Sequence, residues 1–537
     1  MLNRREFLQR SAALSPVVLS ASALLEACGQ AAQQSATGTL TIASTDTPQN
    51  LDTQKTVHFP SVEVVTGSLY DVLWEFKKKQ IASGQFASDF GVDFEPRLAE
   101  SWQVAPDGRT WTVKLRQGVK SAAGNEFTSA DVKWTWDRIS NVKGLGTFYY
   151  LTLTMAADDI KVIDKYTVSF TTGHPAATYT CDMQQFAAVI IDSTEAKKHA
   201  TSDDPWATEW LAKHSAGFGP YVIENWTPGQ QMVLRGRDDY YRGAPKIKRV
   251  IYRAVPESAN RLALLLSGTV DLAEDLSTQE LEKVRSSSGV TDLYWPVGSR
   301  FNAIMMNLAK KPFDDVRVRQ AMAYATPYDD IVSTVYKGRA SRMKTIFPSS
   351  YPFATGEFNR YTTDYDKARS LLSAARVASG FPLTYSYNSA VPEQEQIGIL
   401  MRSSLQKVGI NLTLDKLPPS VFVQKLQGKE FAFTLFQDQP ICPDPGYALF
   451  LYYKTNSFVN YANYSNPEVD SLITQGLATL APDQEKPIWN RVQQLVTQDS
   501  PWIFLVEPGF HLGVRSNVKG ATWYPINQVQ FYDYSKT

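Results

Sequence analysis

The sequence contains very little cysteine, with 3 Cys among 537 residues. These are Cys28, Cys181 and Cys442, and the first stands close to the N-terminus, far from the other two. Cys181 and Cys442 are the one internal pair that a disulfide could join. Their separation in the sequence does not decide between a disulfide bridge and two buried thiols. The position of Cys28 therefore needs an explanation of its own.

The sequence also lacks an excess of either charge. Its 54 Lys and Arg residues balance 54 Asp and Glu residues, so the formal net charge is zero. Nothing in this balance favours nucleic acid or a cationic surface as a partner. Charged residues make up 20% and hydrophobic residues 43%, which is ordinary for a soluble globular protein. A chain of this length exceeds the size beyond which a single hydrophobic core stops growing, so we expect two or more lobes.

Motifs of the common enzyme classes are missing from the sequence. There is no Gly-x-Ser-x-Gly elbow, no Gly-x-x-x-x-Gly-Lys-Ser/Thr phosphate loop and no His-Glu-x-x-His zinc motif. The five histidines never pair at the spacing of metal ligands. We therefore expect no catalytic residue, no metal and no cofactor. A glycoside hydrolase needs only two well-placed carboxylates, so that class stays open as an alternative.

The uncharged run near the N-terminus is too short to cross a bilayer. It extends from Ser11 to Leu25, and its 15 residues suit the apolar part of an export signal, whereas a membrane span needs roughly 17–25. The segment Asn3-Arg4-Arg5-Glu6-Phe7-Leu8 before it resembles a twin-arginine export signal. We therefore expect the protein outside the cytoplasm, in the periplasm or at the cell surface.

Cys28 lies where such a signal would be cut. Leu25-Glu26-Ala27-Cys28-Gly29 resembles a lipoprotein cleavage box, in which the cysteine becomes the new N-terminus and carries lipid. We predict that residues 1–28 are an export signal with this lipobox, that Cys28 anchors the protein to the membrane, and that residues 29–38 form a flexible tether. The alternative is an ordinary secretory signal cut after Ala23.

What the remaining chain does contain is a succession of strand and helix patterns. Thr39 to Ala43 alternates as a strand, and Trp102 to Arg116 is typical of a hairpin that turns at Asp107-Gly108. A helix is predicted over residues 61–78, after a proline. From Pro245 onward strand and helix patterns alternate, which predicts α/β lobes whose sheet edges face a crevice.

Five segments carry a more specific pattern. They are Pro96-Arg-Leu-Ala-Glu-Ser-Trp102, Asp107-Gly-Arg-Thr-Trp-Thr-Val-Lys-Leu-Arg-Gln-Gly-Val119, Phe127-Thr-Ser-Ala-Asp-Val132, Gly219-Pro-Tyr221 and Arg317-Val-Arg-Gln-Ala-Met-Ala-Tyr324. In this order they resemble the large periplasmic solute-binding proteins of ABC importers, extracellular family 5, which includes dipeptide, oligopeptide and nickel binders. One departure is that the family's Leu-Asp-Pro-His appears here as Leu51-Asp52-Thr53-Gln54.

The resemblance implies an α/β, two-lobed periplasmic-binding-protein fold of type II, in the large cluster with an extra subdomain and with a cleft between the lobes. Two crossings would join the lobes and let one lobe rotate about this hinge relative to the other. A ligand that contacts both lobes would then favour the closed state. The implied parts are a first lobe of residues 39–58, 216–297 and 499–537, an inserted subdomain of residues 59–215, and a second lobe of residues 298–498.

The resemblance also implies where a ligand would bind. In peptide-binding members an aspartate of the second lobe receives the α-ammonium group of the ligand, and Asp438 occupies that place here; otherwise it caps a turn before Pro440. Asp444 is expected to cap the following helix. Trp226, on the hinge side, either stacks on the ligand or packs in the core. The predicted ligand-binding residues are Asp438, Phe436, Tyr387, Asn388, His58, Phe59 and Thr47.

The function implied by the family is a monomeric receptor that captures a small polar solute and delivers it to an ABC permease with its ATPase subunits. Peptides are the default ligand, with opines, sugars and other amino-acid conjugates as alternatives. Two other functions remain open from the sequence: a secreted glycoside hydrolase or other carbohydrate-active protein, and a binding protein that serves a chemoreceptor without transport.

Overall fold

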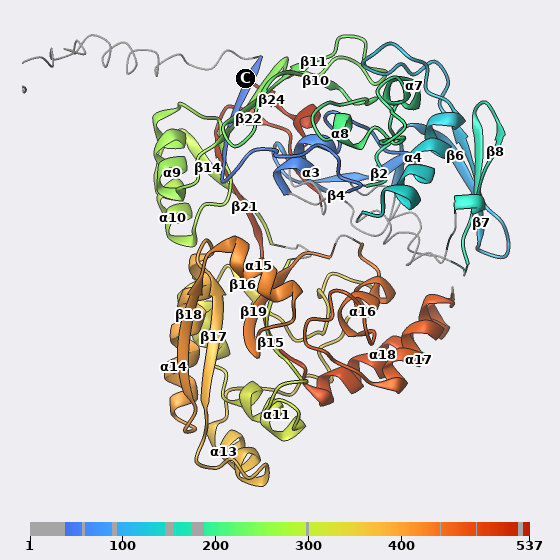
Figure 1. Ribbon diagram of the computed structural model, residues 1–537. Helices are drawn as coiled ribbons and strands as arrows, with labels where there is room; N and C mark the ends of the chain where they lie inside the picture. Colours follow the sequence, from blue (N-terminus) through green and yellow to red (C-terminus); the bar gives the residue numbers. More distant parts are fainter. Residues whose placement is uncertain are drawn as a thin grey trace, which may run out of the picture.

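The chain forms two α/β lobes, one above the other in Figure 1. The computed structural model describes residues 38–55, 59–88, 94–144, 155, 157–173, 175, 187–296, 300–440, 442–479, 481–524 and 530–537. Of the predicted positions, Cys28, His58 and Cys181 lie outside these ranges. Within them, none of the helices has both the length and the apolar composition that crossing a bilayer demands.

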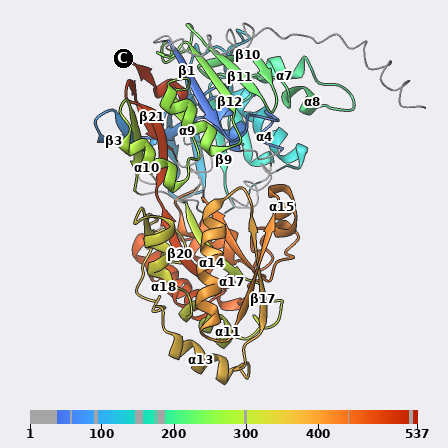
Figure 2. The ribbon, with the colours of Figure 1, turned by 90° about the vertical axis from the view of Figure 1, so that its left-hand side faces the viewer.

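The first lobe is built on a seven-stranded sheet with the order β10-β11-β12-β1-β13-β21-β14. Helices α9 (Ser258–Ser267) and α10 (Thr278–Ser286) pack on one face of this sheet (Figure 2). Helix α9 ends at Gly268, as its glycine predicts, because the backbone there has a φ of 77°. The strands are β1 (Thr39–Ser44), β10 (Tyr221–Thr227), β11 (Gln231–Gly236), β12 (Arg249–Ala254), β13 (Leu272–Ala273), β14 (Val290–Trp295) and β21 (Phe510–Arg515).

Residues 59–215 form smaller sheets and helices beside this sheet. The predicted hairpin is confirmed as β6 (Ala99–Val104) and β7 (Thr110–Leu115), with alternate residues of β7 buried. The predicted helix over 61–78 is wrong beyond its first turns, because α3 (Phe59–Val65) ends before Gly67, where φ is 71°. The other elements are β2 (Trp74–Phe76), β3 (Lys78–Ala82), β4 (Gln85–Ser88), β5 (Phe94–Pro96), α4 (Ser129–Val142), η2 (Ala157–Asp159), β8 (Ile160–Asp164), β9 (Thr167–Thr171), α7 (Ser193–Lys197) and α8 (Thr208–Leu211).

The second lobe is built on a six-stranded sheet with the order β16-β20-β15-β19-β17-β18, and helices cover both of its faces. Ile304 and Met306 of β15 pack with α11, α13 and α14, whereas Ala303 and Met305 pack with α16, α17 and α18. The strands are β15 (Phe301–Met306), β16 (Ala340–Arg342), β17 (Pro382–Asn388), β18 (Asn411–Leu417), β19 (Phe433–Asp438) and β20 (Trp502–Pro508). The helices are α11 (Val316–Tyr324), α12 (Tyr328–Asp330), η3 (Ile331–Val335), α13 (Tyr365–Ala374), α14 (Pro392–Gln406), α15 (Pro419–Gln427), α16 (Pro445–Tyr453), α17 (Pro467–Leu477) and α18 (Pro482–Asp499).

The chain passes between the two large sheets twice, from β14 to β15 and from β20 to β21. Strand β20 pairs with β15 and β16 in the second lobe, so the predicted return to the first lobe at residue 499 is too early. The return falls between Pro508 and Phe510 instead. The C-terminal elements then complete the first lobe: β22 (Val518–Lys519), β23 (Ala521–Trp523), η4 (Phe531–Asp533) and β24 (Ser535–Lys536).

Candidate ligand site between the lobes

Strand direction decides which ends of the first-lobe sheet face the second lobe. Trp295, at the end of β14, pairs with Phe510, at the start of β21, and both adjoin the crossings between the lobes. Strands β13 and β14 both run antiparallel to β21, and β1 runs parallel to β13. The carboxyl ends of β1 and β13 therefore point toward the second lobe, and the residues that follow them lie at the junction of the lobes.

The same reasoning places the strand ends of the second lobe. Phe301 begins β15 after the first crossing, and it pairs directly with Asp438 at the end of β19. Strand β17 runs parallel to β19, so its last residue, Asn388, lies at the same edge. Asp438 and Asn388 thus face the first lobe, at the edge of the sheet that Figures 1 and 2 show below the junction. Ligands of open α/β sheets bind beyond the carboxyl ends of strands.

Asp438 is a half-buried carboxylate with a hydrogen-bond donor at each oxygen. Its Oδ2 accepts a hydrogen bond from the Tyr452 hydroxyl at 2.8 Å, and its Oδ1 accepts one from the backbone N–H of Gln439 at 2.7 Å. Loss of contact with water raises the pKa of this carboxyl above its ordinary value. Asp444, by contrast, caps α16 as predicted, with its Oδ1 2.8 Å from the backbone nitrogen of Tyr447.

The loop after β1 brings polar groups to the opposite side of the junction. Thr47 is completely buried, and its hydroxyl has no hydrogen-bond partner among the residues that the structure describes. The Thr45 hydroxyl donates to Asp275, which follows β13, at 3.1 Å. Buried hydroxyls are almost always hydrogen-bonded, so the Thr47 hydroxyl is an exception, and its contact with a ligand stays a prediction.

Phe436 and Tyr387 are buried in this structure, and their role as ligand contacts stays a prediction. Phe436 is 4% exposed, and its ring centroid lies 5.3 Å from that of Trp502 and 5.9 Å from that of Tyr452. Tyr387 is 3% exposed and stacks on Tyr385 with ring centroids 6.0 Å apart. Helices cover both faces of the second-lobe sheet, so side chains near its strand ends are already enclosed.

Four further predicted positions have different outcomes. Asn388 shapes the turn before α14, since its Oδ1 accepts from the backbone nitrogen of Ala390 at 3.0 Å. Phe59 opens α3, and His58 lies outside the described residues. Trp226 is not on the hinge side, because β10 is the edge strand farthest from β21 and β14; its indole N–H donates to the Pro48 carbonyl at 2.9 Å.

Sequence reasoning missed Glu274, which directly follows β13 at the same edge as Thr47. One of its oxygens accepts from the Tyr252 hydroxyl at 2.9 Å, and burial, aided by the nearby charge of Asp275, raises the pKa of Glu274 to about 7. A signal was present in the sequence: the short strand pattern Val270-Asp-Leu272 is followed, after Ala273, by two acidic residues, much as the first strand is followed by Asp46.

A charged contact joins the lobes beside the crossings. The Asp292 carboxylate in β14 accepts from Arg285 at 2.5 Å and lies 2.9 Å from the His511 ring. Arg339 of the second lobe lies 3.6 Å from the same carboxylate, with its guanidinium 5.2 Å from the ring centre of Tyr294. This contact links β14 of the first lobe to the segment before β16 of the second lobe.

Two lobes that are joined by two crossings, with polar strand ends facing each other across the junction, define a solute-binding protein that closes on its ligand. The model of the bacterial extracellular solute-binding proteins, family 5, matches residues 93–460, and the chain belongs to this family. As this membership entails, the chain is an exported substrate-binding component of an ABC importer.

Similar proteins support this assignment. The chain is 27% identical, over 92% of its length and 93% of the relative, to the probable D,D-dipeptide-binding periplasmic protein DdpA of Escherichia coli K12. Two solved structures share the fold. Periplasmic binding protein DppA of Helicobacter pylori, in complex with the peptide STSA, has a TM-score of 0.81 at 23% identity and covers 93% of this chain and 98% of its own. Binding protein MoaA of A. tumefaciens R10, in complex with mannopinic acid, has a TM-score of 0.80 at 21% identity and covers 94% and 100%.

Proposed function

We propose that this protein binds a short peptide with a free amino terminus between its lobes and delivers it to the permease of its importer. The observation that carries the proposal is Asp438, a half-buried carboxylate at a strand end that faces the other lobe. A charge-assisted hydrogen bond to an ammonium group gains strength when closure removes water from the junction. The peptide-binding relatives named above support this ligand class.

An opine-type amino-acid conjugate is the second candidate, because one similar structure holds mannopinic acid. Such a ligand offers carboxylates and hydroxyls in addition to an amine, and these would use the Thr47 hydroxyl rather than Asp438 alone. No observation favours the glycoside hydrolase, and the similar proteins named above are binding proteins.

Co-purification and lobe closure test this proposal together. Protein that is purified without denaturation is expected to carry a ligand, which native mass spectrometry identifies by its mass. After the ligand is removed, addition of a matching di- or tripeptide is expected to reduce the radius of gyration measured by X-ray scattering, because closed lobes are more compact. The proposal would be contradicted if no peptide or opine of a panel reduced the radius of gyration. It would also be contradicted if the pure protein converted any of these compounds to a product.

We also propose that Cys28 carries lipid and that residues 29–38 tether the receptor to the membrane. Metabolic labelling with radioactive palmitate is expected to mark the wild-type protein and to disappear in Cys28→Ala, because the cysteine supplies both the sulfur and, after cleavage, the amine that accept lipid. Cys181→Ala is the matched control and should keep the label. Secretion of unlabelled wild-type protein into the medium would instead support cleavage after Ala23.

A further inference from the structure

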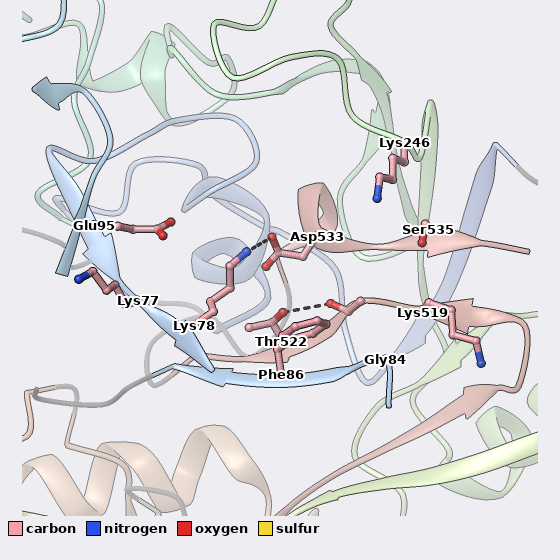
Figure 3. A pocket seen from close by; sticks show the side chains of 11 residues that line it. Lys77, Lys78, Gly84, Phe86, Glu95, Lys246, Lys519, Thr522, Asp533 and Ser535 are labelled. Carbon is pink, nitrogen blue, oxygen red and sulfur yellow. Dashed lines mark hydrogen bonds and ion pairs between the residues drawn. The ribbon is translucent and has the colours of Figure 1, made fainter. Parts of the chain in front are cut away.

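The first lobe has a basic pocket beside its small sheet β23-β4-β3, formed together with C-terminal residues. Its volume is about 580 Å³, and it is lined by Lys77, Lys78, Gly84, Phe86, Glu95, Lys246, Lys519, Gly520, Thr522, Asp533 and Ser535. Four lysines thus meet only two carboxylates. Figure 3 shows Lys78 directed at Asp533, with Lys77 and Lys246 on opposite sides of this pair.

Both carboxylates of the pocket are already engaged by cations. Asp533 accepts a hydrogen bond from Lys78 at 2.5 Å, and Glu95 lies 3.3 Å from the buried guanidinium of Arg97. The lysines on the rim, Lys77, Lys246 and Lys519, have exposed side chains. Lys246 and Lys519 therefore place positive charge on the rim of the pocket above a floor whose carboxylates are neutralised, and this arrangement attracts an anion.

The pocket lies at the point where the chain enters the fold. The backbone N–H of Lys248, two residues after Lys246, donates to the Gly38 carbonyl at 2.8 Å. Lys536, the neighbour of Ser535, donates through its Nζ to the Thr39 carbonyl at 2.9 Å. Gly38 is the last residue of the predicted tether. Ten residues of a flexible chain span about 17 Å on average and at most about 35 Å, so a membrane that holds Cys28 would lie within reach of the pocket.

We propose that this pocket binds the headgroup phosphate of an anionic phospholipid and so fixes the orientation of the first lobe on the membrane. The inference rests on the proposed lipid anchor, which brings the pocket close to lipid, and it extends the proposed function by giving the receptor a defined resting position. Basic residues beside a lipid anchor add to its membrane affinity through their attraction to anionic lipids.

Vesicle flotation tests the pocket without the anchor. Residues 29–537 contain every element that the structure describes, and this chain without lipid is mixed with vesicles of phosphatidylcholine alone or with phosphatidylglycerol added. We expect binding only to the anionic vesicles, weakened by salt. The triple variant Lys77→Gln, Lys246→Gln, Lys519→Gln is expected to bind at least about tenfold more weakly, because each lysine contributes to attraction at a charged surface.

A matched control separates the pocket from net charge. The triple variant Lys161→Gln, Lys367→Gln, Lys486→Gln loses the same charge at exposed positions elsewhere and is expected to bind like wild type. Equal losses in the two triple variants, or no binding to anionic vesicles, would overturn the proposal. Protection of Lys246 from amine labelling by glycerol 3-phosphate, without vesicle binding, would also overturn it and indicate a free phosphate compound instead. Palmitate labelling at Cys28 reports separately on the anchor.

Discussion

Replacing Asp52 with alanine is expected to lower the free energy of unfolding of the first lobe by about 3–5 kcal/mol, because it leaves a buried guanidinium without its partner. Arg138, in α4, is completely buried and its Nη1 lies 2.9 Å from Asp52 Oδ1. The same Nη1 donates to Gln54 at 2.7 Å, and Nε donates to the Trp206 carbonyl at 2.9 Å. Since the free energy of unfolding of a whole domain is only about 5–15 kcal/mol, a decrease of this size should be readily measurable.

The measurement is the thermal and guanidinium-induced unfolding of wild type and variants, followed by calorimetry and fluorescence. Asp238→Ala is the control, because Asp238 forms an ion pair with Lys248 at 2.7 Å but its side chain is 86% exposed. The double variant Asp52→Leu, Arg138→Met is expected to regain much of the lost stability, since an apolar pair needs no ionic partner. An Asp52→Ala protein that unfolds like Asp238→Ala would show that the pair contributes little.

This contact also explains a departure from the family pattern. Gln54 stands where the family has histidine, and its amide accepts from Arg138 while donating to the Ala187 carbonyl at 3.1 Å. A glutamine can do both at once, because its carbonyl oxygen accepts and its amino group donates. The segment Leu51-Asp52-Thr53-Gln54 therefore ties the loop after β1 to helix α4, and its role is structural.

Asp438→Asn is expected to weaken the binding of a peptide with a free amino terminus by about tenfold to a hundredfold, because hydrogen bonds to charged groups contribute about 1–3 kcal/mol. Asparagine keeps the size of the side chain and one acceptor, which can serve the Tyr452 hydroxyl, but it loses the bond from the Gln439 backbone N–H, so thermal unfolding of the variant is measured alongside. Calorimetric titration with the tightest-binding peptide of the panel measures the change. Asp366→Asn, on the exposed surface of α13 in the same lobe, is the control.

An acetylated peptide sharpens this test. If Asp438 contacts the ammonium group, acetylation should weaken binding to wild type but leave little further difference between wild type and Asp438→Asn. If Asp438→Asn weakens the binding of the acetylated peptide as much as it weakens the binding of the free peptide, then Asp438 contacts another part of the ligand or supports the fold. Unchanged affinity for the free peptide, with folding intact, would remove Asp438 from the site.

The pH dependence of binding follows from the same carboxyl group. Burial raises the pKa of Asp438, so its proton returns at a higher pH than for an ordinary aspartate. The ammonium group prefers the ionised carboxylate, so affinity should be complete above this pKa and decline as pH falls through it. In Asp438→Asn this decline should be absent, and its persistence would point to another group, such as Glu274.

Local patterns determined a large part of this protein. Five segments in a fixed order were enough for the family, the two lobes and the solute-binding role, and single residues marked local ends, such as Gly268 after α9 and Asp444 before α16. These features depend on backbone conformation and hydrogen bonds within a few residues, which the sequence specifies directly.

Only the tertiary structure decided which side chains are available at the junction of the lobes. Phe436 and Tyr387 follow strand patterns that suit a ligand surface, yet helices from distant parts of the chain enclose them. Strand β20 belongs to the second lobe because its partners are β15 and β16, and the basic pocket combines residues from positions 77 to 535. Burial, strand partnership and local charge arise between segments that are remote in sequence, and packing alone brings those segments together.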